Sequence, residues 1–298
     1  MSTTRWTRIT CACVALILGG GLVAACGDDS ATSSTTTTGA DASGPPVVEV
    51  SATEAASGAA VTYGYDLPAD LTAGTVQLDL KNTGKEEHQA QIFKLNDGAD
   101  AGALKTKLIA NDIPGALAFG TFDGGTGGTS PGTSSQADAL VDLQQGSYAI
   151  ICFLPDAKGV PHLVNGMFDT FDVGAAKGSP AEAPTATATV KGVNFAFSGD
   201  DPVGKGVVQF TNESTDKPHE ANILKLAPGK TIDDVAKWDG TGEPPYTSIG
   251  GMQAVLPGAG QRMQLDLDSG SYVLICGIPD NDGVPHFKKG MVKPFTVP

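Results

Sequence analysis

Two sets of side chains that can bind a metal recur along this chain, one set in each half. Each set contains, in order, a histidine, a cysteine, a histidine and a methionine. The sets are His88, Cys152, His162 and Met167, and then His219, Cys276, His286 and Met291. A copper ion that cycles between Cu(I) and Cu(II) suits a thiolate and a thioether combined with imidazoles. The pattern therefore predicts one mononuclear copper site in each half, of the kind that transfers electrons.

The two sets use every histidine and every cysteine of the body of the chain. All 4 histidines belong to them. Of the 5 cysteines, Cys11, Cys13 and Cys26 lie near the N-terminus, which leaves Cys152 and Cys276 as the body thiols. The Cys, the second His and the Met each shift by 124 positions between the halves, whereas the first His shifts by 131. Independent drift in two copies rarely keeps all four residue types, so coincidence is a poor explanation.

A duplicated unit must position these residues. Segment 146–173 is identical to segment 270–297 at 15 of 28 positions. The body that contains both copies is about 250 residues long, a natural length for two domains. We predict a first domain over 47–173, a Gly/Ala/Pro-rich linker over 174–184 and a second domain over 185–298.

Short β-branched segments separated by Gly, Pro, Asn and Asp predict an all-β fold. Segments 75–80 and 206–210 are typical. Helix is expected only in the middle of each half, over 99–110 and over 231–238, where Thr231 begins a capping-box-like pattern. Many short strands at this spacing predict two tandem Greek-key β-sandwich or barrel domains.

The Gly/Thr/Ser-rich stretch 120–135, between the first histidine and the cysteine, is predicted to be a long mobile loop. The corresponding region of the second half contains segment 240–245, stiffened by prolines, and then Gly250 and Gly251. We attribute the larger shift of the first histidine to the extra length in the first half.

The first 26 residues have the pattern of an export signal. Two arginines precede an apolar stretch, 11–25, that is too short and too interrupted by glycine to span a bilayer comfortably. The run 22–26, Leu-Val-Ala-Ala-Cys, resembles the lipobox of bacterial lipoproteins, which implies a lipidated Cys26 at the mature N-terminus; an ordinary secretory signal is the alternative. Segment 27–46 is predicted to be a flexible stalk. We therefore expect a lipid-anchored protein on the extracytoplasmic face of a cell membrane.

The charge balance narrows the class of partner. After loss of the signal, 17 Lys and Arg oppose 33 Asp and Glu, a net charge of about −16 at neutral pH. Nucleic acid is excluded as a partner on this ground. The acidic field favours encounter with a cationic partner, such as a redox protein, although solubility is the commoner reason for such a charge.

Two motifs resemble those of the cupredoxin, or blue copper, family, plastocyanin-like domains in particular, over both halves. The first is a strand, an Asn-containing turn and a histidine, as in LKNTGKEEHQAQIFKL and FTNESTDKPHEANILKL. The second is a Tyr-containing strand that ends in Cys, followed by Pro, Gly, His and Gly-Met. Its residues are Tyr148, Cys152, Pro155, Gly159, His162, Gly166 and Met167, and Tyr272, Cys276, Pro279, Gly283, His286, Gly290 and Met291. The resemblance implies one type 1 copper site per domain, with Cys dominating the bonding and Met as a weak axial ligand.

One departure from that pattern concerns the loop between Cys and His. Nine residues separate Cys152 from His162 and Cys276 from His286, a longer gap than in single-domain blue copper proteins. Copper nitrite reductases resemble this sequence in having a loop of nearly this length. The loops also carry Asp156 and Asp280, which would favour the higher oxidation state of a metal if they approached it.

Other chemistry has little support in the sequence. No His-x-His pair exists, so a trinuclear copper cluster of the multicopper oxidase kind is excluded, and no catalytic residue is assigned. We expect a carrier and not an enzyme. Two alternatives keep the fold: an envelope protein that binds or delivers copper without electron transfer, and a metal-free interaction module. In the second, the Cys and His residues would serve packing, or Cys152 and Cys276 would form a disulfide.

Overall fold

The computed structural model describes residues 44–57, 60–238 and 241–298. The predicted signal, with Cys26, and the predicted stalk as far as residue 43 lie outside the described residues. The described residues all belong to one compact unit, Ala42–Pro298. Within them, no helix has the length and apolar character needed to cross a membrane.

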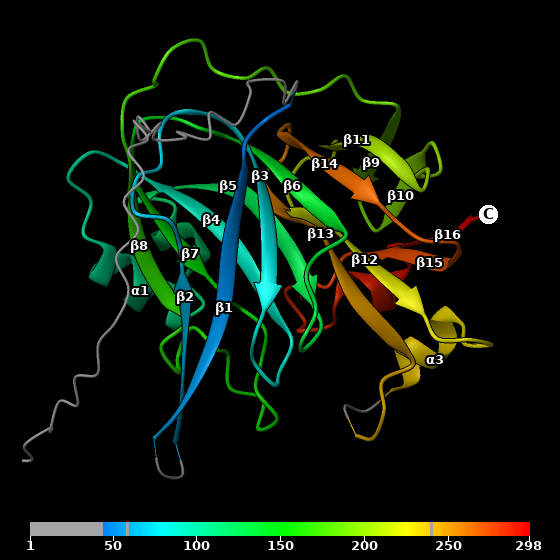
Figure 1. Cartoon of the computed structure of the whole chain (residues 1–298). Helices are drawn as coiled ribbons and strands as arrows, with labels where there is room; N and C mark the ends of the chain where they lie inside the picture. Colours follow the sequence, from blue (N-terminus) through cyan, green and yellow to red (C-terminus); the bar gives the residue numbers. More distant parts are fainter. Residues whose placement is uncertain (1–43, 58–59, 239–240) are drawn as a thin grey trace, which may run out of the picture. The chain divides into compact units, whose positions relative to one another are not determined.

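The first half of the described chain builds eight strands in two sheets (Figure 1). One sheet has the order β2-β1-β3-β6 and the other β5-β4-β7-β8. Neighbouring strands are antiparallel, except that β1 and β3 are parallel. The strands are β1 (Val47–Ser57), β2 (Ala60–Asp66), β3 (Gly74–Asn82), β4 (His88–Leu95), β5 (Gly120–Thr129), β6 (Ala137–Leu143), β7 (Gly146–Ile151) and β8 (Phe168–Val173).

The second half repeats this topology strand for strand. Its sheets have the orders β10-β9-β11-β14 and β13-β12-β15-β16, and the parallel pair is β9 and β11. The strands are β9 (Ala188–Val193), β10 (Ala196–Gly199), β11 (Lys205–Asn212), β12 (His219–Leu226), β13 (Tyr246–Val255), β14 (Gly260–Asp266), β15 (Gly270–Ile275) and β16 (Val292–Val297). The predicted all-β class and duplicated Greek-key sandwich are confirmed.

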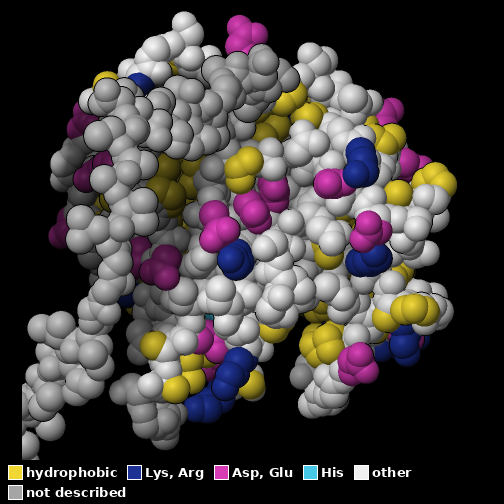
Figure 2. Space-filling model, in the orientation of Figure 1, with side chains coloured by type: hydrophobic (Ala, Val, Ile, Leu, Met, Phe, Trp, Pro, Cys, Tyr) yellow, Lys and Arg dark blue, Asp and Glu magenta, His cyan; other side chains and the backbone are white. Residues whose placement is uncertain are grey.

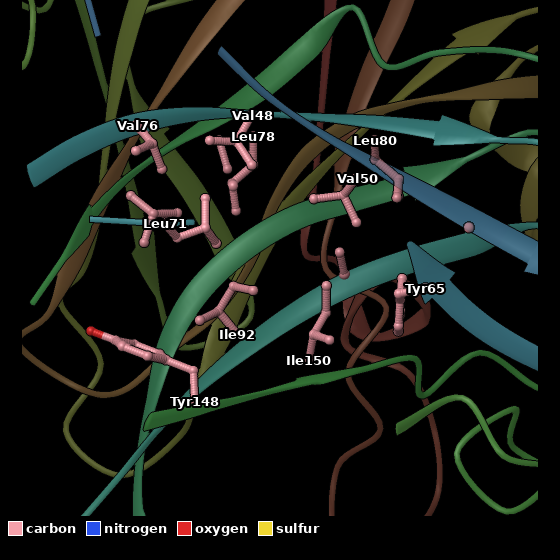
Figure 3. Close-up of a cluster of buried hydrophobic side chains, with 14 of the residues drawn as sticks. Val48, Val50, Tyr65, Leu71, Val76, Leu78, Leu80, Ile92, Tyr148 and Ile150 are labelled. Atoms are coloured by element: carbon pink, nitrogen blue, oxygen red, sulfur yellow. The ribbon is translucent and has the colours of Figure 1, made fainter. Parts of the chain in front are cut away.

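Alternating side chains of facing strands fill the space between the two sheets of each half. In the first half, Val76, Leu78 and Leu80 of β3 are buried and meet Ile92 of β4 and Ile150 of β7 in one cluster (Figure 3). Successive side chains of a strand point to opposite faces, so one apolar face per strand suffices to build such a core. The same cluster contains Cys152 and Met167, which places the predicted ligands at the end of the core.

Both sheets continue from one half into the other. Strand β6 pairs with β14, Ala139 opposite Met263, and β5 pairs with β13, Thr129 opposite Ile249. The β13 backbone also receives a hydrogen bond of 2.8 Å from the amide N–H of Gln136. The two sandwiches therefore share backbone hydrogen bonds and are not simply tethered by a linker.

The prediction of a long mobile loop over 120–135 is wrong, because its first ten residues form β5. Glycine is required there for close approach of backbones. A Cβ at Gly125, whose φ is +129°, would clash with the carbonyl oxygen of Ala90 on β4. Gly251 of β13, with φ +115°, stands in the same relation to Ala221 of β12. The β4–β5 pair and the β12–β13 pair each have a register shift at this point, so the two glycines mark β-bulges. The partner strands β4 and β12 are the ones that begin with a histidine ligand.

The expected helices are confirmed in both halves. The first half contains α1 (Ala101–Ile109) and the short α2 (Ile113–Ala116), and the second contains α3 (Ile232–Lys237). Thr231 caps α3, and its side chain and that of Asp234 form the two reciprocal bonds of a capping box. The 3-10 turn η1 (His286–Lys289) begins at a predicted ligand, His286.

Candidate metal centres

The first candidate centre joins three segments of the first half. His88 is the first residue of β4, Cys152 directly follows β7, and His162 comes from the loop before β8. The Nδ1 atoms of the two histidines lie 3.1 Å apart, and Cys152 Sγ lies 3.5 Å from His162 Nδ1. All three side chains are 0 % exposed, and their ligating atoms lie within 4.8 Å of one another. The sequence prediction that these three residues converge is thus met in the structure.

The second candidate centre has the same arrangement at the start of β12 and the end of β15. His219 Nδ1 and His286 Nδ1 lie 3.2 Å apart. Cys276 Sγ lies 3.8 Å from the first of these atoms and 3.4 Å from the second. In both centres the Nδ1 atoms face the sulfur, so the Nε2 atoms face outward and are free to bond to the surrounding protein.

The two predicted methionine ligands are held close to these groups by the backbone. Met167 and Met291 are 0 % exposed and directly precede β8 and β16. The Met167 amide donates to the carbonyl of His162 over 2.9 Å, and its carbonyl accepts from the amide of Cys152 over 3.2 Å. The second half repeats both bonds, at 3.0 and 3.3 Å. Their thioethers as copper ligands remain a prediction.

The nine-residue gap between Cys and His is bridged by a small closed turn. The His162 amide donates to the carbonyl of Leu154 over 2.8 Å, and the Leu163 amide donates to that of Cys152 over 2.9 Å. Pro155 and Pro161 form a bridge at the neck of the turn, as Pro279 and Pro285 do in the second half. The long loop therefore returns to its starting point, and the imidazole comes back to the sulfur.

Asp156 and Asp280 fasten these turns, and Asp280 also lies close enough to His286 for its charge to act on that imidazole. Asp156 accepts from the amides of Lys158 and Val160 over 2.9 Å each. Asp280 forms ion pairs with Lys217 at 2.9 Å and Lys289 at 2.6 Å. The bond from the Val160 amide has the largest effect on Asp156 and lowers its pKa. The bonds from the two lysines have the largest effect on Asp280 and lower its pKa.

Burial sets the protonation of the ligand groups. It raises the pKa of Cys152 to about 12 and also raises that of Cys276. It lowers the pKa of His88 and lowers that of His219 to about 4, with a smaller effect from the neighbouring imidazole in each case. Both of these imidazoles are therefore neutral near pH 7, with a lone pair available to a metal, and metal binding must release the thiol proton.

This donor set fits copper. Two imidazole nitrogens and one thiolate in a compact group, next to a buried thioether, combine ligands that suit Cu(I) with ligands that suit both oxidation states. Cys152 and Cys276 are both free and lie in separate centres, so the alternative of a disulfide between them is wrong.

The groups that surround the imidazoles were not found from the sequence. In the first centre, Glu54 and Glu86 bond to the outward nitrogens, and the ring of Tyr63 stacks on His162 at 4.2 Å. Glu86 lies two residues before His88 in the sequence. Glu54 and Tyr63 lie on β1 and β2, far from the ligands in the sequence, and no motif marks them as neighbours of the site. In the second centre the corresponding contacts come from Ser214 and Phe195.

Comparisons with known proteins give structural matches of low similarity only. No protein-family model matches the chain, and no curated protein sequence matches it. Among solved structures, the auracyanin of Roseiflexus castenholzii is similar at 23 % identity, covering 38 % of this chain and 99 % of that one, with a TM-score of 0.27. Auracyanin A of Chloroflexus aurantiacus, a "blue" copper protein, is 18 % identical over 44 % of this chain and 99 % of its own, with a TM-score of 0.28.

A longer match spans both halves. The copper nitrite reductase of Nitrosomonas europaea is 11 % identical, covering 85 % of this chain and 93 % of that one, with a TM-score of 0.24. At such scores the matches carry no argument. The strand order and the donor groups of this chain define it as cupredoxin-like, with two sites that fit copper.

Proposed function

We propose that this protein is a copper-binding electron carrier with one site in each half, held by a lipid on Cys26 at the extracytoplasmic face of a cell membrane. The observation that carries the proposal is the pair of buried His/Cys/His groups, each with its ligating atoms within 4.8 Å of one another. Met167 and Met291 supply the proposed axial thioethers. When bound, copper supplies a one-electron couple at each site.

The chain contributes rigidity to both sites. Backbone hydrogen bonds join the Cys, the second His and the Met of each centre, so the donors keep their places when the charge of the metal changes. The six His and Cys ligands are 0 to 1 % exposed. Such burial suits a carrier better than an enzyme, which must admit a substrate to its metal.

Copper titration of the mature chain, residues 26–298, tests the copper sites. We expect two equivalents of Cu(II) to bind, an intense thiolate-to-copper band in the visible spectrum and a reversible one-electron couple. Cys152→Ser and Cys276→Ser each remove one equivalent, and the double variant removes both. Met167→Leu changes the spectrum of the first site, whereas the matched control Met252→Leu, a buried core methionine outside both centres, leaves it unchanged.

Three results would contradict parts of the proposal. Absence of bound copper, or copper content unchanged in the double Cys variant, would favour a metal-free interaction module. Tight Cu(I) binding without a reversible couple would favour copper binding or delivery without electron transfer.

The membrane anchor is tested separately, in cells. Cys26→Ala is expected to move the protein from the detergent-soluble membrane fraction to the aqueous phase, because a lipid chain is the only anchor proposed. A Cys26→Ala protein that stays with the membrane would contradict the lipid anchor. Because the net charge is about −16, we expect any redox partner to dock through a cationic face.

A further inference from the structure

The outward nitrogens of the first centre both bond to carboxylates. His88 Nε2 lies 3.1 Å from Glu54 Oε1, and His162 Nε2 lies 2.8 Å from Glu86 Oε2. Glu54 Oε1 also accepts the backbone N–H groups of Lys85 at 2.7 Å and of Glu86 at 2.8 Å. Backbone N–H donors favour the ionised form of a carboxyl group. Glu54 is therefore a carboxylate held in place beside the centre by the backbone.

The second centre has no such carboxylates among the residues that the structure describes. His219 Nε2 lies 2.7 Å from the hydroxyl oxygen of Ser214, and the ring of His286 meets the ring of Phe195 edge-on, with centroids 5.0 Å apart. The ammonium groups of Lys217 and Lys289 lie over that phenylalanine ring, 5.7 and 5.2 Å from its centroid. The carboxylate of Asp280 pairs with both lysines, and the buried carboxyl of Glu220 accepts from the amide of Gly277 next to Cys276. Among the described residues, neither carboxyl bonds to a ligand imidazole, so this centre lacks the anionic hydrogen-bond partners of the first.

One loop position carries opposite charges in the two halves. The side-chain amide of Asn82 donates to the carbonyl of Glu86 over 2.7 Å, and that of Asn212 donates to the carbonyl of Lys217 over 2.8 Å. Each of these two residues precedes its histidine by two positions. The same backbone arrangement therefore presents a carboxylate to the first centre and an ammonium to the second.

Glu54 has no counterpart because the hairpins differ in length. Strands β1 and β2 have 11 and 7 residues, whereas β9 and β10 have 6 and 4. In the register of the parallel pairs, Ala52 lies opposite Asn82 and Gly192 lies opposite Asn212. Two residues after Ala52, strand β1 still continues and contains Glu54. Two residues after Gly192, strand β9 has ended.

We propose that the two centres are redox-inequivalent: the first has the lower potential and favours Cu(II), and the second has the higher potential and favours Cu(I). This inference rests on the proposed function. Anionic hydrogen-bond partners make a ligand imidazole a stronger donor and stabilise the more positive ion, and nearby cations do the reverse.

The hydroxyl of Tyr65 lies close to Cys152, and its counterpart on β10 is a phenylalanine, Phe197. This hydroxyl donates its one hydrogen to the carbonyl of Gln89. The hydrogen is therefore not available to the sulfur, and the contact does not offset the two carboxylates.

The order of the sheet keeps the two centres apart. Strands β4, β5, β13 and β12 are antiparallel at each step, so β4 and β12 run in opposite directions. His88 and His219 are the first residues of those two strands. The centres thus lie at opposite ends of these strands, and each can be measured without the other.

The test measures each centre alone in the full mature chain. Cys276→Ser isolates the first centre and Cys152→Ser the second. Dissociation constants for Cu(I) and Cu(II), from competition with chelators of known affinity, give the order of the potentials without an electrode. We expect the Cu(II) preference of the first centre to exceed that of the second at least tenfold, about 59 mV for a one-electron couple.

Charge variants identify the cause. In the Cys276→Ser background, Glu86→Gln and Glu54→Gln each shift the first centre toward Cu(I), whereas the control Glu49→Gln, an exposed residue paired with Lys81, has no effect. In the Cys152→Ser background, Lys217→Gln shifts the second centre toward Cu(II). Equal preferences at two copper-loaded centres, or Gln variants that behave like the control, overturn this inference alone. Absence of copper at both centres overturns the proposed function with it.

Discussion

The loops that carry Cys, His and Met close through the same backbone hydrogen bonds in both halves, whereas the hairpins beside them do not match. In each half the second histidine returns to within 3.5 Å of the sulfur. The hairpin β1–β2, however, extends over the first centre with Glu54 and Tyr63, and β9–β10 ends before that point. The backbone that places the ligands is thus kept in both copies, while the charge that surrounds them differs.

The bulges of β5 and β13 should contribute equally to the free energy of unfolding if the two halves have the same backbone structure. Gly125→Ala and Gly251→Ala are each expected to cost about 3 kcal/mol or more, because a Cβ would meet a carbonyl oxygen at a positive φ. Denaturant unfolding of the copper-free protein measures the cost. The control is Gly132→Ala, also at a positive φ but with no atom within 4 Å of the added Cβ, for which about 1 kcal/mol is expected. A harmless substitution in one half would break the equivalence.

The buried tyrosines of β7 and β15 should show a smaller difference between the halves. The Tyr148 hydroxyl donates to the carbonyl of Gln144 over 2.9 Å and accepts from the Gln144 N–H over 2.8 Å and from Lys94 Nζ over 3.3 Å. The Tyr272 hydroxyl donates to the carbonyl of Asp268 over 2.7 Å. We expect Tyr148→Phe to lower the free energy of unfolding by about 2 kcal/mol and Tyr272→Phe by about 1 kcal/mol. Equal losses in urea unfolding would show that the additional bonds of Tyr148 add nothing.

Asp79 on β3 and Asp138 on β6 form an acidic pair that should make the stability of the first half depend on pH. Burial first, and then the charge of Asp79, raise the pKa of Asp138 to about 6. Its protonated form is therefore favoured by folding: this stability is complete below pH 3.8 and is lost as the pH rises through about 6. The position that corresponds in β14 is Arg262, which bonds to Gln209.

Asp138→Asn should therefore stabilise the protein by about 1 kcal/mol at pH 8 and have little effect at pH 4, after allowance for partial exposure of the carboxyl. Thermal unfolding as a function of pH measures the difference. The control is Asp266→Asn, an exposed residue paired with Lys205, which should not alter the pH profile. A profile unchanged by Asp138→Asn would mean that the carboxyl is well solvated in the folded state.

The sequence predicted those parts of the molecule that depend on residue type and local order. The six His and Cys ligands could be named because they exhaust the histidines and the body cysteines, and the two Met ligands because they recur at the same spacing. The start of α3 followed from Thr231 and Asp234. The stretch 120–135 was misjudged for a physical reason. A run of glycines permits both a mobile loop and a closely packed strand, and the neighbouring strands β4 and β13 distinguish them.

By itself, then, the sequence determined the duplication, the all-β class and the chemical identity of the donor atoms. Tertiary structure decided that each donor group converges, since the neck of the turn between Cys152 and His162 is closed by bonds that no local pattern announces. It also decided which charges face the imidazoles. Glu54 reaches His88 across 34 positions of the chain, a contact that follows from the register of β1 on β3 and from the length of one hairpin.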